Sequence, residues 1–325
     1  MGKSPKPSPI DGILVVDKPR GRTSHDVVEM VRRLAGFRQI GHLGTLDPLA
    51  TGVLVLVLGR ATRLARFYSG RRKRYTCAVR FGFATDTYDA DGEPAGPDAS
   101  PSLDAGEIAS LAAKFVGRFE QVPPPFSAKK IHGRPAHELA RKNKPVKLDP
   151  VEVDVYEFRL TGIEGSTARF TVECGAGTYI RSLAHEIGKL DGSGAHLSKI
   201  VRTAVGEFTL DQAVSIADLE QDARAGEIAR RVIPLEGMLP DFPRATVLPI
   251  IERRILHGAK FTLPLAQIQP GNITAAQGAP EQLDSGDWKP SRLRVFNQQG
   301  RLIAIAEPVV MRTYQPLVVL EPCPA

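Results

Sequence analysis

The chain has 325 residues, of which 42% are hydrophobic and 24% are charged. These proportions are ordinary for a globular protein with a sizeable core, so they exclude global disorder, and the length allows two domains. The 43 basic and 36 acidic side chains give a net charge of +7, which favours a polyanionic partner.

The cysteines and the apolar runs bear on the compartment. Cys77, Cys174 and Cys323 lie far apart and form no CxxC pair, which argues against a disulfide framework and a zinc site. The start of the chain, residues 1–9, is polar and rich in proline, and no apolar run is long enough to cross a bilayer. We therefore expect a cytoplasmic protein that does not bind membranes.

Local patterns in the first third of the chain predict strands and helices after a flexible tail at 1–10. Thr23 and Asp26 match a capping box, the apolar stripe that follows predicts a helix, and Gly36 is a suitable end for it. The run 53–58 is wholly apolar, which predicts a strand buried on both faces. The predicted elements are strands at 13–16, 53–58 and 75–83 and helices at 27–34 and 61–68.

The rest of the chain changes character twice. Residues 120–150 are rich in proline and lysine, which predicts an inserted arm. From 245 onward, short β-like runs alternate with glycine and proline turns, which predicts a small β-rich module. Between these regions and before the arm we expect helices at 102–119 and from Ile180, and strands at 151–160, 168–174 and 196–208. Because strands and helices mix without a regular βα repeat, the predicted fold class is α+β.

The segment 41–52 holds three glycines, one histidine (His42) and one carboxylate (Asp47). It directly precedes the buried strand at 53–58, so Asp47 is placed at the mouth of that strand. Two interpretations are open. Aspartate before proline is a common helix start, so Asp47 is either a helix cap or a carboxylate that does chemistry.

Seven basic residues fall within fifteen positions that contain no acidic residue. They are Arg60, Arg63, Arg66, Arg71, Arg72, Lys73 and Arg74. The run is either a solvated surface or a surface that contacts phosphates. Tyr75 follows it directly, and an aromatic residue beside cations suits stacking on a nucleobase, although a half-buried strand tyrosine is an equally common explanation.

The turn at 175–181 leads from a strand into a helix, with Thr178 as the predicted cap. Its glycines allow a ligand to approach the backbone, and the free helix N–H groups favour an anion. Tyr179 is either core or site, and Arg181 is either a surface residue or the ion-pair partner of a functional carboxylate. The acidic segment 86–92 fails the calcium-loop pattern, so we predict a structural turn there.

Six segments occur in the order found in the TruB family of pseudouridine synthases, and residues 10–240 resemble that family. The segments are 17–24, 41–52, 73–75, 85–92, 127–130 and 177–182. Six segments in register are far more specific than any one of them. The resemblance implies a catalytic domain at 11–240, with a mixed, largely antiparallel sheet, flanking helices and an RNA-clamping arm at about 120–150. It also implies a PUA-like domain at 245–325.

The resemblance implies that the chain isomerises a uridine in the T-arm of tRNA, at position 55, to pseudouridine. The N1–C1′ bond breaks, the flipped-out uracil turns, and C5 bonds to C1′, with no metal and no cofactor. Asp47 would be the essential carboxylate, either attacking C1′ or removing the 2′-proton. Arg181 would pair with Asp47, Tyr75 would stack on the uracil, and Tyr179 would contact the base edge and serve in the late proton removal from C5.

The resemblance also implies a set of RNA contacts. His42 would occupy the space that the flipped uridine leaves. The remaining implied contacts are Lys18, Arg60, Lys73, Arg74, Lys129 and Lys130. We expect a monomer that acts on tRNA with no protein partner. The alternative is a non-catalytic RNA-binding or RNA-folding protein on the same scaffold, which would not require Asp47, Tyr75 or Arg181.

Overall fold

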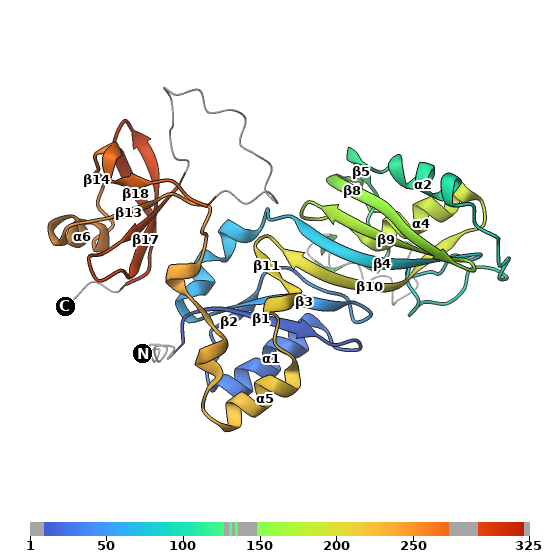
Figure 1. The fold of residues 1–325 in the computed structure, drawn as a ribbon, viewed down its shortest axis with the longest axis horizontal. Coiled ribbons are helices and arrows are strands. Elements are labelled where there is room, and N and C mark those ends of the chain that lie inside the picture. The colour runs from blue at the N-terminus through green and yellow to red at the C-terminus, as the bar shows by residue number, and fades with distance from the viewer. Residues whose placement is uncertain (1–9, 127–129, 132–133, 136–147, 273–291, 322–325) are drawn as a thin grey trace.

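The computed structural model describes residues 10–126, 130–131, 134–135, 148–272 and 292–321. Among these residues, ten strands form one large sheet in the order β12-β1-β3-β10-β4-β9-β8-β5, with β2 beside β3 and β11 beside β10 (Figure 1). The strands are β1 (Gly12–Lys18), β2 (Ile40–His42), β3 (Thr51–Leu58), β4 (Lys73–Phe81), β5 (Gly117–Gln121), β8 (Val151–Glu164), β9 (Thr167–Cys174), β10 (Ala195–Val205), β11 (Phe208–Thr209) and β12 (Ile233–Pro234). Within this described sheet only β3 and β10 pair in parallel, so the predicted mixed, largely antiparallel α+β class is confirmed.

Helices cover one face of the large sheet. They are α1 (Ser24–Ala35), α2 (Ala105–Ala113), α4 (Ile180–Asp191) and α5 (Ile216–Arg224). Val27, Ile108, Leu183 and Leu219, one from each helix, belong to a single hydrophobic core with inward residues of the sheet. In Figure 1, α1 and α5 lie against the β1–β3 half, whereas α2 and α4 lie against the β8–β9 half. The helices are thus the flanking layer that the α+β class requires.

The opposite face of β1 and β3 is also buried. Val53, Val55 and Val57 belong to a second core, which they share with the 3-10 helix η1 (Gly59–Tyr68), whereas Leu54 and Leu56 face the first core. This two-sided burial explains why every residue at 53–58 is apolar, as the sequence predicted. The capping box of Thr23 and Asp26 is also confirmed.

A second sheet forms the C-terminal part, in the order β14-β18-β17-β16-β13-β15. Its strands are β13 (Arg244–Thr246), β14 (Phe261–Thr262), β15 (Ile268–Gln269), β16 (Leu293–Phe296), β17 (Leu302–Val310) and β18 (Thr313–Val319). This β-rich part has a core of its own, against which α6 (Pro249–Leu256) packs. It lies at the η1 end of the molecule (Figure 1) and contributes Phe296, Ile305 and Val318 to the second core.

Several shorter elements complete the described structure. They are the hairpin β6 (Lys130–Ile131) and β7 (Arg134–Pro135) and the 3-10 turns η2 (Leu210–Gln212), η3 (Ile228–Arg231), η4 (Leu235–Gly237) and η5 (Leu265–Gln267). No helix in the described ranges combines the length and the hydropathy that a membrane crossing needs.

One predicted helix was wrong at its end. The expected helix at 102–119 spans only Ala105–Ala113, and residues 117–121 form strand β5 instead. Asp104 caps the helix, and Gly117 adopts a φ of +116°, which suits glycine and redirects the chain. The strand then pairs with β8, so tertiary pairing overrides the local pattern.

Gly52 begins β3 with a φ of +94°, and a Cβ there would overlap the carbonyl oxygen of Arg202. We expect Gly52→Ala to lower the free energy of unfolding by about 3 kcal/mol or more, because backbone strain and a clash with main chain combine. Gly21→Ala is the matched control, since Gly21 has a φ of +82° but open space around its Cβ position. Strain alone should cost about 1 kcal/mol there. If urea unfolding shows the same decrease in the free energy of unfolding for both variants, the clash with the Arg202 carbonyl adds no cost.

Candidate active site

A cavity of about 470 Å³ opens at the centre of the large sheet. It is lined by six of the residues that the sequence singled out, which come from three separate segments of the chain. They are His42, Asp47, Lys73, Tyr75, Tyr179 and Arg181. The long-range pairing of β3, β4 and β10 and the turn before α4 bring these segments together.

Asp47 lies in a turn, not at the start of a helix. Residues 48–50 form that turn, in which the Ala50 N–H donates to the Asp47 carbonyl at 3.1 Å. The helix-cap interpretation of Asp47 is therefore excluded. The carboxylate is 46% exposed and forms an ion pair with Arg181, with 2.9 Å between Oδ2 and Nε. It is thus held in place and still open to a ligand.

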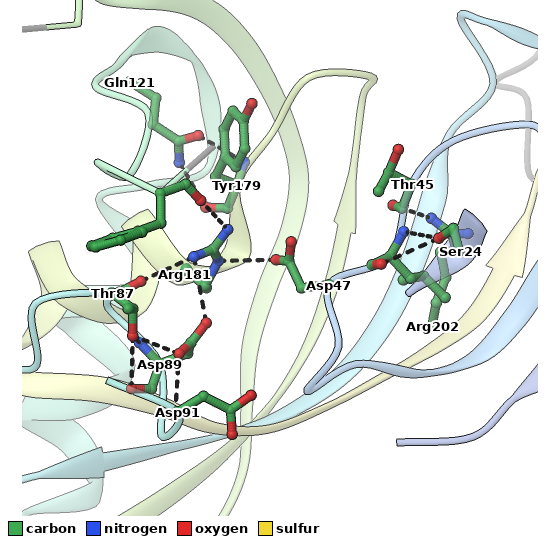
Figure 2. Close-up of polar contacts among 12 residues, drawn as sticks. Ser24, Thr45, Asp47, Thr87, Asp89, Asp91, Gln121, Tyr179, Arg181 and Arg202 are labelled. Carbon is green, nitrogen blue, oxygen red and sulfur yellow. Dashed lines mark hydrogen bonds and ion pairs between the residues drawn. The ribbon is translucent and has the colours of Figure 1, made fainter. Parts of the chain in front are cut away.

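Arg181 is buried and its guanidinium is held on several sides (Figure 2). Nη1 donates to the Thr87 carbonyl at 3.1 Å, and Nη2 donates to the Phe126 carbonyl at 3.0 Å. Nη1 also lies 3.4 Å from Oδ2 of Asp89, so a second carboxylate shares the same cation. These contacts fix the direction from which the guanidinium faces Asp47.

Asp89 is a site residue that sequence reasoning missed. Residues 86–92 do form a turn, as predicted, but Asp89 within it is buried and pairs with Arg181. Burial raises the pKa of Asp89, and the Thr87 hydroxyl and the Arg181 guanidinium partly offset that rise. Nothing in the local pattern marks Asp89 out from its acidic neighbours, since only tertiary contact brings it to Arg181.

Two further residues hold the loop that carries Asp47. Arg202, fully buried on β10, donates from Nε to the Val53 carbonyl at 2.7 Å and from Nη2 to the Gly44 carbonyl at 3.2 Å. The Ser24 hydroxyl accepts the Leu46 N–H at 2.8 Å. Figure 2 shows both residues on the side of the loop away from Arg181. No local pattern marks out either of them.

The two tyrosines occupy different settings. Tyr75 lies on β4 directly opposite Arg202 of β10. Burial raises the pKa of its phenol, so the hydroxyl keeps its proton at neutral pH. Tyr179 is half-buried and immediately precedes α4. The predicted cap, Thr178, was wrong: Tyr179 is the N-cap residue, with φ −100° and ψ 109°, and its own side chain makes no capping hydrogen bond.

His42 lies at the end of β2, on the wall of the cavity. Burial, together with the nearby Arg202 guanidinium, lowers the pKa of the imidazole, so the ring is neutral at physiological pH. A neutral, flat side chain suits a position beside nucleobases better than a phosphate contact.

The predicted phosphate contacts have partners within the protein. Lys18 is fully buried and donates to the carbonyls of Pro19 and Arg22 at 3.0 and 2.6 Å. Lys73 lines the cavity and donates to the Arg71 carbonyl at 2.6 Å. Lys129 lies outside the described residues, as does the side chain of Lys130. Their RNA contacts remain predictions.

Each arginine of the basic run also has a protein partner. The pairs are Arg60 with Asp11, Arg63 with the Val319 carbonyl, Arg66 with the Leu317 carbonyl, Arg71 with Asp241, and both Arg72 and Arg74 with Glu173. Three of these arginines, on η1, therefore reach the C-terminal region: Arg63 and Arg66 contact β18, and Arg60 also lies 3.8 Å from Glu321. The run joins parts of the protein, a role that neither sequence interpretation included.

Comparison with known proteins agrees with this site. Residues 32–180 match the model of the TruB family pseudouridylate synthase N-terminal domain, and residues 181–240 match that of the tRNA pseudouridylate synthase B C-terminal domain. The chain belongs to the TruB family of pseudouridylate synthases. Five of the six cavity residues named above fall in the first matched region. The sixth, Arg181, is the first residue of the second matched region.

Relatives in the TruB family cover nearly the whole chain. The tRNA pseudouridine synthase B of Solibacter usitatus is 42% identical over 311 residues, which is 96% of this chain and 100% of that protein. The tRNA pseudouridine synthase B of Thermotoga maritima is 38% identical over 296 residues, covering 91% and 89%. A solved Cbf5–Nop10–Gar1 complex contains a chain with the same fold, at a TM-score of 0.69 and 22% identity, with 99% of this chain and 93% of that one covered.

The buried ammonium of Lys18 makes stability depend on pH. Burial lowers its pKa from 10.5 to about 8, although Asp47 acts in the opposite direction. Between pH 8 and 10.5 the folded protein releases a proton that the unfolded chain keeps. The free energy of unfolding therefore rises as the pH increases through this range and falls as the pH is lowered.

We therefore expect the free energy of unfolding of the unmodified chain to rise relative to that of Lys18→Met as the pH increases from 8 to 10. Urea unfolding at several pH values measures this difference. The exposed Lys199 provides the control Lys199→Met, for which no such trend is expected. If the difference in the free energy of unfolding between the unmodified chain and Lys18→Met does not change with pH, burial does not lower the pKa of Lys18.

Proposed function

We propose that this chain isomerises uridine 55 in the T-arm of tRNA to pseudouridine, with Asp47 as the essential carboxylate. One observation carries the assignment of the site: the half-exposed Asp47 is paired with the buried Arg181 in a cavity that Tyr75 and Tyr179 also line. Membership of the TruB family and relatives named tRNA pseudouridine synthase B support the reaction.

The reaction begins with access to the base. A uracil stacked in the folded T-arm cannot reach Asp47, so the nucleotide must be flipped out of the stack into the cavity. Tyr75 stacks on the extruded uracil, and the neutral His42 takes the space that the base leaves. The rest of the T-arm is held by its shape and its phosphates.

The bond rearrangement is balanced without an external reagent. The N1–C1′ bond breaks, the freed uracil turns, and C5 forms the new bond to C1′, after which the C5 proton leaves and N1 is protonated. Asp47 either attacks C1′, forming an ester bond that C5 later displaces, or takes the 2′-proton and returns it to C2′ when C5 bonds to C1′. Both routes need an ionised carboxylate. Arg181 favours that form, because a cation beside a carboxylate stabilises its charge. Tyr179, against the base edge, serves in removal of the C5 proton.

The proposal includes the organisation of the chain. The catalytic domain spans 11–240, and the β-rich domain at 245–325 is PUA-like; separate sheets and a separate C-terminal core support this division. The RNA-clamping arm at about 120–150 falls largely outside the described residues. We expect the protein to act on tRNA as a monomer in the cytoplasm, without a protein partner.

Asp47→Asn should bind a T-arm stem-loop with nearly unchanged affinity and form no pseudouridine, because an amide can neither attack C1′ nor accept the 2′-proton. Release of tritium from RNA labelled at uridine C5 measures turnover, and filter binding measures affinity. The assay uses the purified chain without added protein or guide RNA. Retained turnover in Asp47→Asn would contradict the catalytic role, and inactivity of the unmodified chain would favour the non-catalytic RNA-binding alternative.

Arg181→Met should lower turnover on the order of 10²-fold or more, since Asp47 and Asp89 would lose the cation they share. RNA binding should fall only modestly, because the guanidinium is buried. The matched control is Arg169→Met, which removes an exposed arginine paired with Glu164 on the same sheet. Similar turnover in both variants would mean that Arg181 has no part in catalysis.

A further inference from the structure

Gln121, at the end of β5, contacts the backbone of Tyr179 through both ends of its carboxamide. Nε2 donates to the Tyr179 carbonyl at 3.1 Å, and Oε1 accepts the Tyr179 N–H at 2.8 Å (Figure 2). The Gln121 side chain is buried, with 4% of the residue exposed. It therefore pairs with Tyr179 as a neighbouring strand would, although the partner is a side chain.

The chemistry of this pair requires a carboxamide. The Tyr179 N–H needs an acceptor, and its carbonyl, which also accepts the Leu183 N–H at 3.3 Å, can take a second donor, so the orientation of the amide is set by the backbone that it meets. Methionine has a similar length but supplies neither group. Glutamate would keep the acceptor and set a second carboxylate oxygen against the Tyr179 carbonyl. Gln121 is thus specific for this geometry and is not merely a filler of space.

The residues after Gln121 hold the same turn. The Val122 carbonyl accepts from the Ser182 hydroxyl at 2.8 Å, and the Phe126 carbonyl accepts from Nη2 of Arg181 at 3.0 Å. Residues 123–125 are all proline, so their φ angles are fixed and they offer no competing N–H groups. A stiff segment therefore presents its carbonyls at set positions to the start of α4.

Tyr179 is a residue whose direction needs such support. It stands two residues after Gly177, which has a φ of +86°. It is the N-cap residue of α4, and its own side chain makes no capping hydrogen bond. The same turn is held at its other end, where the Gly175 N–H donates to the Asp154 carbonyl of β8 at 2.8 Å. Strand β8 pairs with β5, so one edge of the large sheet fixes both ends of the turn.

We propose that Gln121 is a positioning residue for the isomerisation, which fixes the Tyr179 backbone and thereby the place where the Tyr179 ring enters the cavity. The inference rests on the proposed function for its catalytic consequence. A displacement of about 1 Å at a reacting group lowers rates on the order of 10²-fold. Gln121 lies behind Tyr179 and is buried, so its loss acts on the rate and leaves RNA affinity unchanged.

The first test compares Gln121→Met with Ser182→Ala. Both remove hydrogen bonds between the 121–126 segment and the start of α4, but only Gln121→Met removes the two hydrogen bonds from a side chain to the Tyr179 backbone. Single-turnover rates with saturating T-arm stem-loop should fall about 10- to 100-fold for Gln121→Met, with a change in Kd below about threefold. Ser182→Ala should retain most of the rate. Equal losses in the two variants, or a loss in Kd alone, would overturn the proposal.

A double-mutant cycle separates positioning from general support of the fold. In the background of Tyr179→Leu, Gln121 has no tyrosine to direct, so adding Gln121→Met should cause little further loss of rate. If Gln121 only supports the fold, the two losses will multiply, which contradicts the proposal. Thermal melting of each variant identifies those that do not fold.

Hydrogen exchange tests the same contact without reference to activity. The Tyr179 amide should exchange at least about tenfold faster in Gln121→Met than in the unmodified chain or in Ser182→Ala, because its acceptor is gone. Unchanged exchange would overturn the positioning role even if the rate falls. If the unmodified chain makes no pseudouridine, the proposed function fails, and the exchange measurement alone still decides whether Gln121 fixes Tyr179.

Discussion

The buried guanidinium of Arg181 is the interaction on which the arrangement of the site depends. It joins Asp47, from the loop before β3, and Asp89, from the turn after β4, to the start of α4. A buried cation is costly unless its donors are paired, and here backbone carbonyls and two carboxylates share that task. Because the partners come from distant segments, the sheet and its helical layer must form before the ion pair can exist. The site therefore depends on the fold of the large sheet and its helices as a whole.

Basic charge in this protein has a structural use besides the one that composition suggests. The arginines at 60–74 meet carboxylates and carbonyls of the protein, and those on η1 connect to the C-terminal sheet across the second core. Arginine suits this task, because its planar donors can satisfy the carbonyls at a strand edge. A net charge of +7 thus favours a polyanion without identifying which cations touch it. Lys73 is the member of the run that lines the cavity.

Prediction from the sequence succeeded where local rules act alone. The capping box at Thr23, the two-sided burial of 53–58 and the α+β class follow from residue type and period, and the structure confirms them. The helix predicted at 102–119 and the Thr178 cap were wrong, because β5 pairs with β8 and the Tyr179 N–H is bound by Gln121. In both cases a contact with a distant segment outweighed a local preference.

The sequence by itself determined which segments carry unusual chemistry: a lone carboxylate among glycines at Asp47, and a glycine turn that ends in Tyr179 and Arg181. Together with four further segments, their order along the chain indicated the family. Only the tertiary structure decided that Asp47 is no helix cap and that Asp89 shares its arginine. It also decided that Arg202 holds the segment of Asp47 and Gln121 holds the segment of Tyr179, both from behind. These residues contact their partners across strands far apart in sequence, and no local period or spacing encodes such a contact.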